Sequence, residues 1–169
     1  MITPSTTGPI RHRFLAVLDF LLRYGVQVYS VGVSPMSVTV LLDERGGTEA
    51  TAAAIRAHLA LTDAGTEPPQ ATARPHKDID GGDAAILAVT GVLPEVGDIS
   101  LSTQLDTETT ELVAQAAGHP ELPRTTETPI DLGCLRVAAG LTALARDAQR
   151  AIPEPRTAEA TAETADAEQ

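Results

Sequence analysis

The stretch from Ala84 to Leu105, AAILAVTGVLPEVGDISLSTQL, decides the fold class. Its composition predicts a strand over 84–93, a turn containing Pro94 and Gly97, and a second strand over 98–105. In the second strand, one set of alternate residues is mainly apolar: Ile99, Leu101, Thr103 and Leu105. The residues between them, Ser100, Ser102 and Gln104, are polar. Because successive side chains of a strand point to opposite faces, we expect one face to be buried and the other to meet water.

The same order of features occurs twice, over 26–61 and over 86–117. Each run reads as strand, Pro-bearing turn, strand, acidic residue and Thr-started helix. The first helix begins at Thr48 and has Ala52, Ile55 and Leu59 at helical spacing, which predicts that these three side chains face the core. We therefore expect an α+β fold with a mainly antiparallel sheet of four to five strands, built from two ββα units with helices packed mainly on one face.

The length suits one domain, which we expect to span 10–152. Its half-units cover about 10–61 and 73–118, and a C-terminal helix follows over 129–151, with Thr128 as N-cap and Pro129 at the first helical position. The Gly- and Pro-containing segment 62–72 predicts a linker, and 73–77 predicts a short edge strand, because Pro75 cannot donate to a central ladder. We expect a flexible N-terminus over 1–9 and a disordered, acidic Ala/Thr/Glu tail over 153–169.

Composition narrows the class of partner. The formal net charge is -11, and residues 1–60 hold five Arg against four acids, so the acidic excess lies in the remainder. Binding to nucleic acid normally needs a basic face, so we expect a protein partner or self-association instead. No apolar run approaches the roughly 20 residues of a membrane helix, and the N-terminus lacks a signal-peptide pattern. We therefore expect a cytoplasmic protein with no membrane contact.

The core must be aliphatic and rich in alanine. Aromatic residues make up 2% of the chain, and all four lie before residue 30. The Ala-, Thr-, Arg- and Pro-rich composition resembles that of proteins from high-GC actinobacteria, a resemblance that carries over no functional residue. Helices with small side chains can approach a sheet closely, so we expect thin layers with little bulky packing.

The sequence indicates no catalytic residue set, no metal site and no cofactor. The four His residues lack the spacing of metal ligands. Cys134 is the single cysteine, so neither an intrachain disulfide nor a thiolate cluster can form. These features favour a non-enzymatic protein.

Two segments are candidates for a small-ligand site. The first, Arg45, Gly46, Gly47 and Thr48, opens a helix, where backbone N–H groups can bind an anion; the Lys and spacing of a phosphate-binding loop are missing. The second contains His76, Asp78, Asp80 and Asp83. Acids around glycines can surround calcium, but Gly82 and Val89 stand where that pattern needs acids. A hairpin turn explains the same residues.

The favoured hypothesis is a protein-interaction or accessory module, with self-association as one form of that interaction. An antiparallel sheet covered on one face leaves the other face for a partner. The candidate interaction face consists of Ser37, Thr39, Ser100, Ser102 and Gln104. The alternative is a small-ligand-binding or enzymatic domain that uses the helix start at 45–48 and the loop at 76–83.

Overall fold

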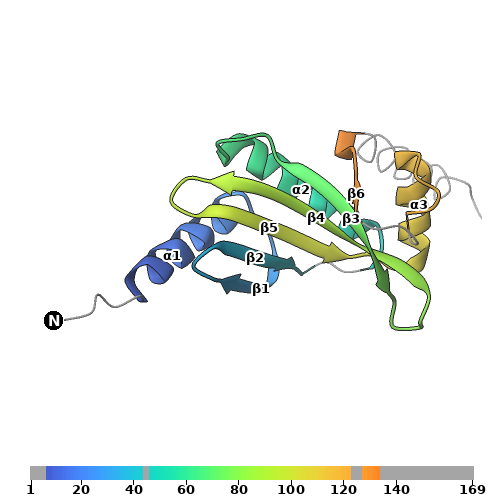
Figure 1. Ribbon diagram of the computed structural model, residues 1–169, viewed down its shortest axis with the longest axis horizontal. Helices are drawn as coiled ribbons and strands as arrows, with labels where there is room; N and C mark the ends of the chain where they lie inside the picture. Colours follow the sequence, from blue (N-terminus) through green and yellow to red (C-terminus); the bar gives the residue numbers. More distant parts are fainter. Residues whose placement is uncertain (1–6, 44–45, 123–126, 134–169) are drawn as a thin grey trace, which may run out of the picture.

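The computed structural model describes residues 7–43, 46–122 and 127–133. Within these ranges the chain forms three helices and six strands (Figure 1). The helices are α1 (Thr7–Arg23), α2 (Thr48–Ala64) and α3 (Thr107–Ala117). The strands are β1 (Val28–Val33), β2 (Ser37–Leu42), β3 (Gln70–Lys77), β4 (Asp83–Leu93), β5 (Gly97–Gln104) and β6 (Thr128–Pro129).

One mixed sheet contains all six strands in the order β1-β2-β5-β4-β3-β6. The neighbours β2 and β5 run parallel, with Val40 beside Leu101; every other neighbouring pair is antiparallel. The class is therefore α+β, as the sequence predicts. The parallel pair joins the β1–β2 hairpin to the β3–β4–β5 meander at the middle of the sheet.

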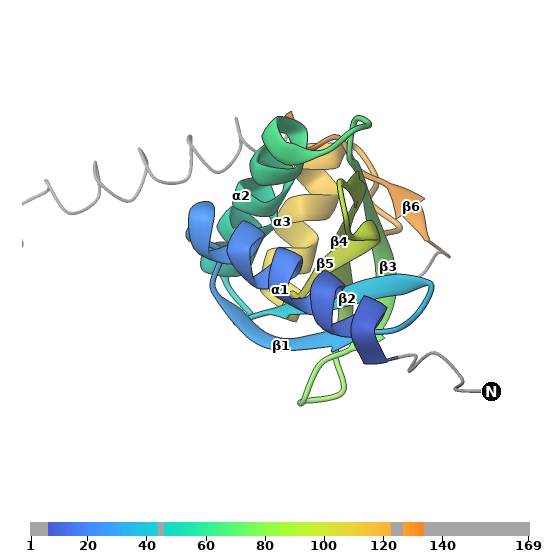
Figure 2. The ribbon, with the colours of Figure 1, turned by 90° about the vertical axis from the view of Figure 1, so that its left-hand side faces the viewer.

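The helices lie together on one side of the curved sheet (Figure 2). α2 packs on β4 and β5, α3 packs on β4, and α1 contacts β1. Burial alternates along the strands accordingly, because Val38, Val40 and Leu42 of β2 are fully buried while Ser37 and Thr39 are exposed. The core thus fills the space between the helices and one face of the sheet.

The prediction of four to five strands in two ββα units is wrong. Residues 70–72, which were expected in a linker, begin β3, and this strand pairs with β4 along eight residue pairs, from Gln70 opposite Thr90 to Lys77 opposite Asp83. The second half therefore contributes a three-stranded meander, and the two halves are not equivalent units. Pro75 fits in β3 because β6 pairs only with Thr72 and Ala73, so β3 has no described neighbour beside the proline.

The expected helix start at Thr128 and Pro129 is a strand instead. These two residues form β6 along β3, and the amide of Ile130 donates to the carbonyl of Ala71 at 2.9 Å. Proline disfavours helical geometry in the residue before it, and edge positions tolerate its missing N–H, so the pair suits a short edge strand. Most of the expected helix 129–151, and all of the expected tail 153–169, lie outside the described residues.

α2 packs through alanines rather than through the predicted stripe. Its buried side chains are Ala50, Thr51, Ala53, Ala54, Ala57, Ala60 and Leu61. Ala52 and Ile55 are half-buried, and Leu59 is exposed. The close approach of α2 explains this choice: a Cβ placed on Gly91 of β4 would lie 3.3 Å from a methyl group of Leu61. Larger residues on this face would hold the helix away from the sheet.

α1 begins at Thr7, inside the segment 1–9 for which flexibility was expected, and it connects the two hairpins of the sheet. The guanidinium of Arg13 donates from Nε to the carbonyl of Val96 at 2.6 Å and from Nη1 to the carbonyl of Ser34 at 2.5 Å. Ser34 lies in the β1–β2 turn and Val96 in the β4–β5 turn. One side chain therefore links turns from the two halves of the chain.

Candidate functional site

The five residues of the predicted interaction face lie together on the side of the sheet that the three described helices leave uncovered, here called the open face. Ser37 and Thr39 come from β2, and Ser100, Ser102 and Gln104 come from β5. The parallel register places Thr39 beside Ser100. Alternation along the strands brings these side chains to one face, because the residues between them point into the core.

The open face extends across strands that the sequence pattern did not connect to it. The cross-strand partners are Thr90, Ala88 and Ile86 of β4, Gln70 and Thr72 of β3, and Gly32 of β1. One row crosses five strands as Gln70, Thr90, Ser100, Thr39 and Gly32. Sequence reasoning missed β3 and β4 here because strand order was unknown; the small, alternating side chains of β4 were the available signal.

A shallow hollow of about 260 Å³ lies at one end of the open face. Thr39, Thr90, Ser100 and Gln70 line it, together with Pro68 from the α2–β3 connection. Hydroxyl and amide groups can each donate and accept hydrogen bonds. The charged residues of this surface lie toward its ends, with Glu67 and Asp98 lining the hollow and Arg74 opposite Ile86. Between these charges the open face is uncharged, with hydroxyl and amide side chains beside the apolar residues Ala88 and Ile86.

In the predicted anion site at 45–48, one of the backbone N–H groups is already engaged in a hydrogen bond within the fold. The Gly46 amide donates to the carbonyl of Gln104 at 2.8 Å, so this N–H closes the end of β5. Gly47 occupies the N-cap position of α2 and has no side chain to cap it. Thr48, predicted as the N-cap, is the first helical residue, and its hydroxyl donates to Glu49 at 3.3 Å. Arg45 lies outside the described residues.

The acidic segment 76–83 forms the end of the β3–β4 hairpin. Lys77 pairs with Asp83, while Asp78 accepts from the Ile79 amide at 2.7 Å through Oδ1 and from the Thr107 amide at 3.4 Å through Oδ2. Half-buried His76 sits opposite Ala84 in the ladder. These bonds give the segment a structural role. Asp80 lies in the turn and is exposed.

Both candidate segments meet the first turn of α3. A Cβ on Gly46 would lie 3.3 Å from Oδ2 of Asp106, and a Cβ on Gly82 would lie 2.4 Å from Oγ1 of Thr107. Asp106 caps α3 by accepting from the Thr109 amide at 2.7 Å. Sequence reasoning assigned Asp106 and Thr107 only to the helix start and missed their contacts with both loops. Across residues 7–43, 46–122 and 127–133, no group of three or more His, Cys, Asp or Glu is placed to hold a metal ion.

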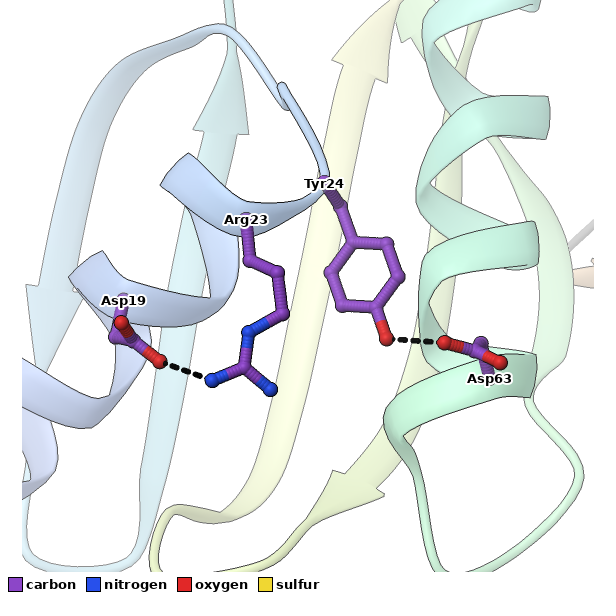
Figure 3. A network of polar contacts seen from close by, with 4 residues as sticks. All are labelled: Asp19, Arg23, Tyr24 and Asp63. Atoms are coloured by element: carbon purple, nitrogen blue, oxygen red, sulfur yellow. Dashed lines mark hydrogen bonds and ion pairs between the residues drawn. The ribbon is translucent and has the colours of Figure 1, made fainter.

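A second hollow, of about 200 Å³, lies between α1, the end of α2 and the β4–β5 turn. Figure 3 shows the polar contacts at its margin: Arg23 donates to Asp19 at 2.8 Å, and the Tyr24 hydroxyl donates to Asp63 of α2. The hydrogen bond to Asp63 raises the pKa of Tyr24 above its usual value near 10, and partial burial and the carboxylate charge act in the same direction. This contact ties the C-terminal ends of α1 and α2 together.

Comparison of the chain with protein-family models, with curated proteins and with solved structures found no match. Among the helices of the described part, none has the length and apolar character that crossing a membrane requires.

Proposed function

We propose that this protein is a non-enzymatic protein-binding module and that its open face receives a protein partner. The observation that carries the proposal is the row of uncharged residues, Gln70, Thr90, Ser100, Thr39 and Gly32, across five strands of a sheet whose other face holds the core. The hydroxyl and amide groups of this row can donate and accept hydrogen bonds, and their desolvation costs less than that of charged groups.

The charge of the chain defines the chemistry of the partner. With a net charge of -11, the protein attracts basic proteins over long range. The hollow beside Thr39 and Ser100 also has Glu67 and Asp98 in its lining, so the part of the partner that enters it carries neutral or basic side chains. The partner is therefore a protein with a basic surface around a neutral contact patch.

The alternative role, a small-ligand or enzymatic site at 45–48 and 76–83, has weaker support. The Gly46 amide and the Asp78 carboxylate bond to the ends of neighbouring elements, and Lys77 pairs with Asp83. The Gly46 N–H must give up its bond before it can donate to a ligand, and the carboxylates of Asp78 and Asp83 already have part of their acceptor capacity in use.

The test places a long, charged side chain beside the hollow of the open face. Thr39→Arg and Ser100→Arg are two such variants, and Gln115→Arg, at an exposed position of α3, adds the same charge outside the open face. We expect wild type and Gln115→Arg to capture the same partner from cell extract and both open-face variants to lose it. With the purified partner, each open-face variant should bind at least about tenfold more weakly, which is about 1.4 kcal/mol.

Equal binding by all four proteins would rule out the open face as the contact surface. Circular dichroism confirms that each variant is folded before binding is compared.

A further inference from the structure

The 260 Å³ hollow at one end of the open face has two carboxylates in its lining. Asp98 of β5 lies on the open face, because the next residue, Ile99, is buried in the core. Glu67 belongs to the connection between α2 and β3. Both acidic residues are exposed, so a partner can reach them from solvent.

Two different elements bring these acidic residues to the same position of the sheet. The Thr66 amide donates to the carbonyl of Val92 at 3.0 Å, which fixes the residue before Glu67 beside the end of β4. Val92 is also the ladder partner of Asp98, and Ser37 of β2 lies opposite Asp98 on the other side. The α2–β3 connection and three strands therefore position one hollow with an acidic residue from each side of Val92.

The lining of the hollow accepts many hydrogen bonds and contains no positive charge. Besides the two acids, its residues are uncharged, and the polar ones are Ser37, Thr39, Gln70, Thr90 and Ser100. Within the described part of the chain, neither Glu67 nor Asp98 forms an ion pair. Two carboxylates that no cation neutralises, beside neutral acceptor groups, favour a positively charged group as the occupant.

The size and the acceptors of the hollow indicate which cation fits. Its volume is below the roughly 300–1,000 Å³ of small-molecule pockets, so it suits one side chain of a protein. A guanidinium carries five N–H donors in one plane and can bond a carboxylate through two of them at once, whereas an ammonium group has three donors around a compact charge. A metal ion fits less well, because within residues 7–43, 46–122 and 127–133 no third His, Cys, Asp or Glu joins the two acids.

We propose that the hollow is an arginine-binding subsite, in which a guanidinium of the partner donates hydrogen bonds to Glu67 and Asp98 and to the hydroxyls of Thr39 and Ser100. This assignment rests on the proposed function, since it names the side chain that the partner brings to the open face. The hollow lies at one end of that face, so the arginine belongs to the basic margin of the partner's contact patch.

The experiment titrates the full chain with three capped tripeptides that carry arginine, lysine or citrulline between two glycines. Citrulline has nearly the shape of arginine without its charge. Proton–nitrogen correlation NMR follows the backbone amides. We expect the arginine peptide to shift the amides of Ser37, Gln70 and Ser100 in a saturable way, the lysine peptide to bind more weakly and the citrulline peptide to cause no saturable shift. Higher ionic strength should weaken the binding of the arginine peptide.

Two conservative variants test the carboxylates. Glu67→Gln and Asp98→Asn each keep the shape of the side chain and remove one charge. Each should raise the Kd of the arginine peptide about two- to fivefold, the effect of losing one exposed ion pair, and the combined variant should raise it further.

The matched control is Asp80→Asn, at an exposed position of the β3–β4 turn, which lies at the opposite end of β4 from the hollow. It removes the same charge and should leave the Kd nearly unchanged. The dispersion of each NMR spectrum shows that the variant is folded.

Three results would overturn the subsite: no saturable shift with the arginine peptide, equal binding of the arginine and citrulline peptides, or equal weakening by Asp80→Asn. A lysine peptide that binds as tightly as the arginine peptide would overturn the choice of a guanidinium.

The two proposals fail in different ways. If the arginine peptide does not bind while Thr39→Arg and Ser100→Arg still lose the captured partner, the subsite is wrong and the proposed function stands. If the peptide binds in the hollow while those two variants keep the partner, the proposed function is wrong and the hollow still binds arginine.

Discussion

At the scale of single residues, Tyr24 is the group whose environment changes its chemistry most clearly. Its hydroxyl donates to Asp63, which lies 39 positions further along the chain. Ionising the phenol would replace this hydrogen bond with two adjacent negative charges, so the folded state holds the proton more tightly than the unfolded chain does. The contact therefore couples the packing of α1 against α2 to pH in the alkaline range.

We expect the phenol of Tyr24 to titrate above pH 10 and Asp63→Asn to bring its midpoint back toward the usual value. Tyr29→Phe leaves Tyr24 as the single tyrosine, so ultraviolet absorbance of the phenolate follows it alone. Because the pKa is raised in the folded state, the stability from this contact is fully present below about pH 10 and is lost as the pH rises through the folded pKa. An unchanged midpoint in Asp63→Asn would show that Asp63 is not the cause.

At the scale of elements, the clearest patterns predict the structure best. α3 begins at Thr107 and ends before Gly118 as expected, because Asp106 caps it and Gly118 adopts a positive φ of 70°. β5 alternates cleanly and has the predicted faces. β3 was recognised only in part, because its polar residues and Pro75 carry little strand signal; its pairing along β4 determines its length.

β5 supplies the prediction at this scale. Leu101 is fully buried between Val40 and Val89, whereas Ser102 lies on the open face beside Ala88. Leu101→Ala should lower the free energy of unfolding by about 2–5 kcal/mol because it leaves a cavity. Ser102→Ala should lower it by less than about 1 kcal/mol.

Urea denaturation of both variants measures this contrast. A larger loss for Ser102→Ala would mean that the two faces of β5 are reversed, because a shift of one residue exchanges them. The open face would then be the core.

At the scale of the whole molecule, the arrangement depends on contacts between distant segments, which local patterns do not encode. The parallel pairing of β2 with β5 joins residues 37–41 to residues 98–102, and no periodicity in either segment specifies that partner. Local patterns also describe the open face only in part. Alternation along the strands identifies Thr39 and Ser100 as residues of this face, but the strand order is needed to place Thr90 and Gln70 beside them. The place of β1 at one end of the sheet, among the strands that the structure describes, likewise follows from the order of the strands.

Arg13 is the side chain that joins the two halves of the chain most directly, so it carries the prediction at this scale. Its guanidinium bonds to the carbonyls of Ser34 and Val96, one in each of two turns. Arg13→Met keeps most of the aliphatic stem and removes both bonds, and it should lower the free energy of unfolding by about 1.5–3 kcal/mol, the range for hydrogen bonds from a charged group.

The matched control is Arg11→Met, at an exposed position of the same helix, which removes the same charge and should change stability by less than about 0.5 kcal/mol. Chemical denaturation of both variants, with an unchanged dependence on denaturant, measures the difference. Equal losses in the two variants would show that the charge of α1, and not the link between the turns, contributes to the free energy of unfolding. The two hairpins would then be held together by the β2–β5 ladder and the apolar core alone.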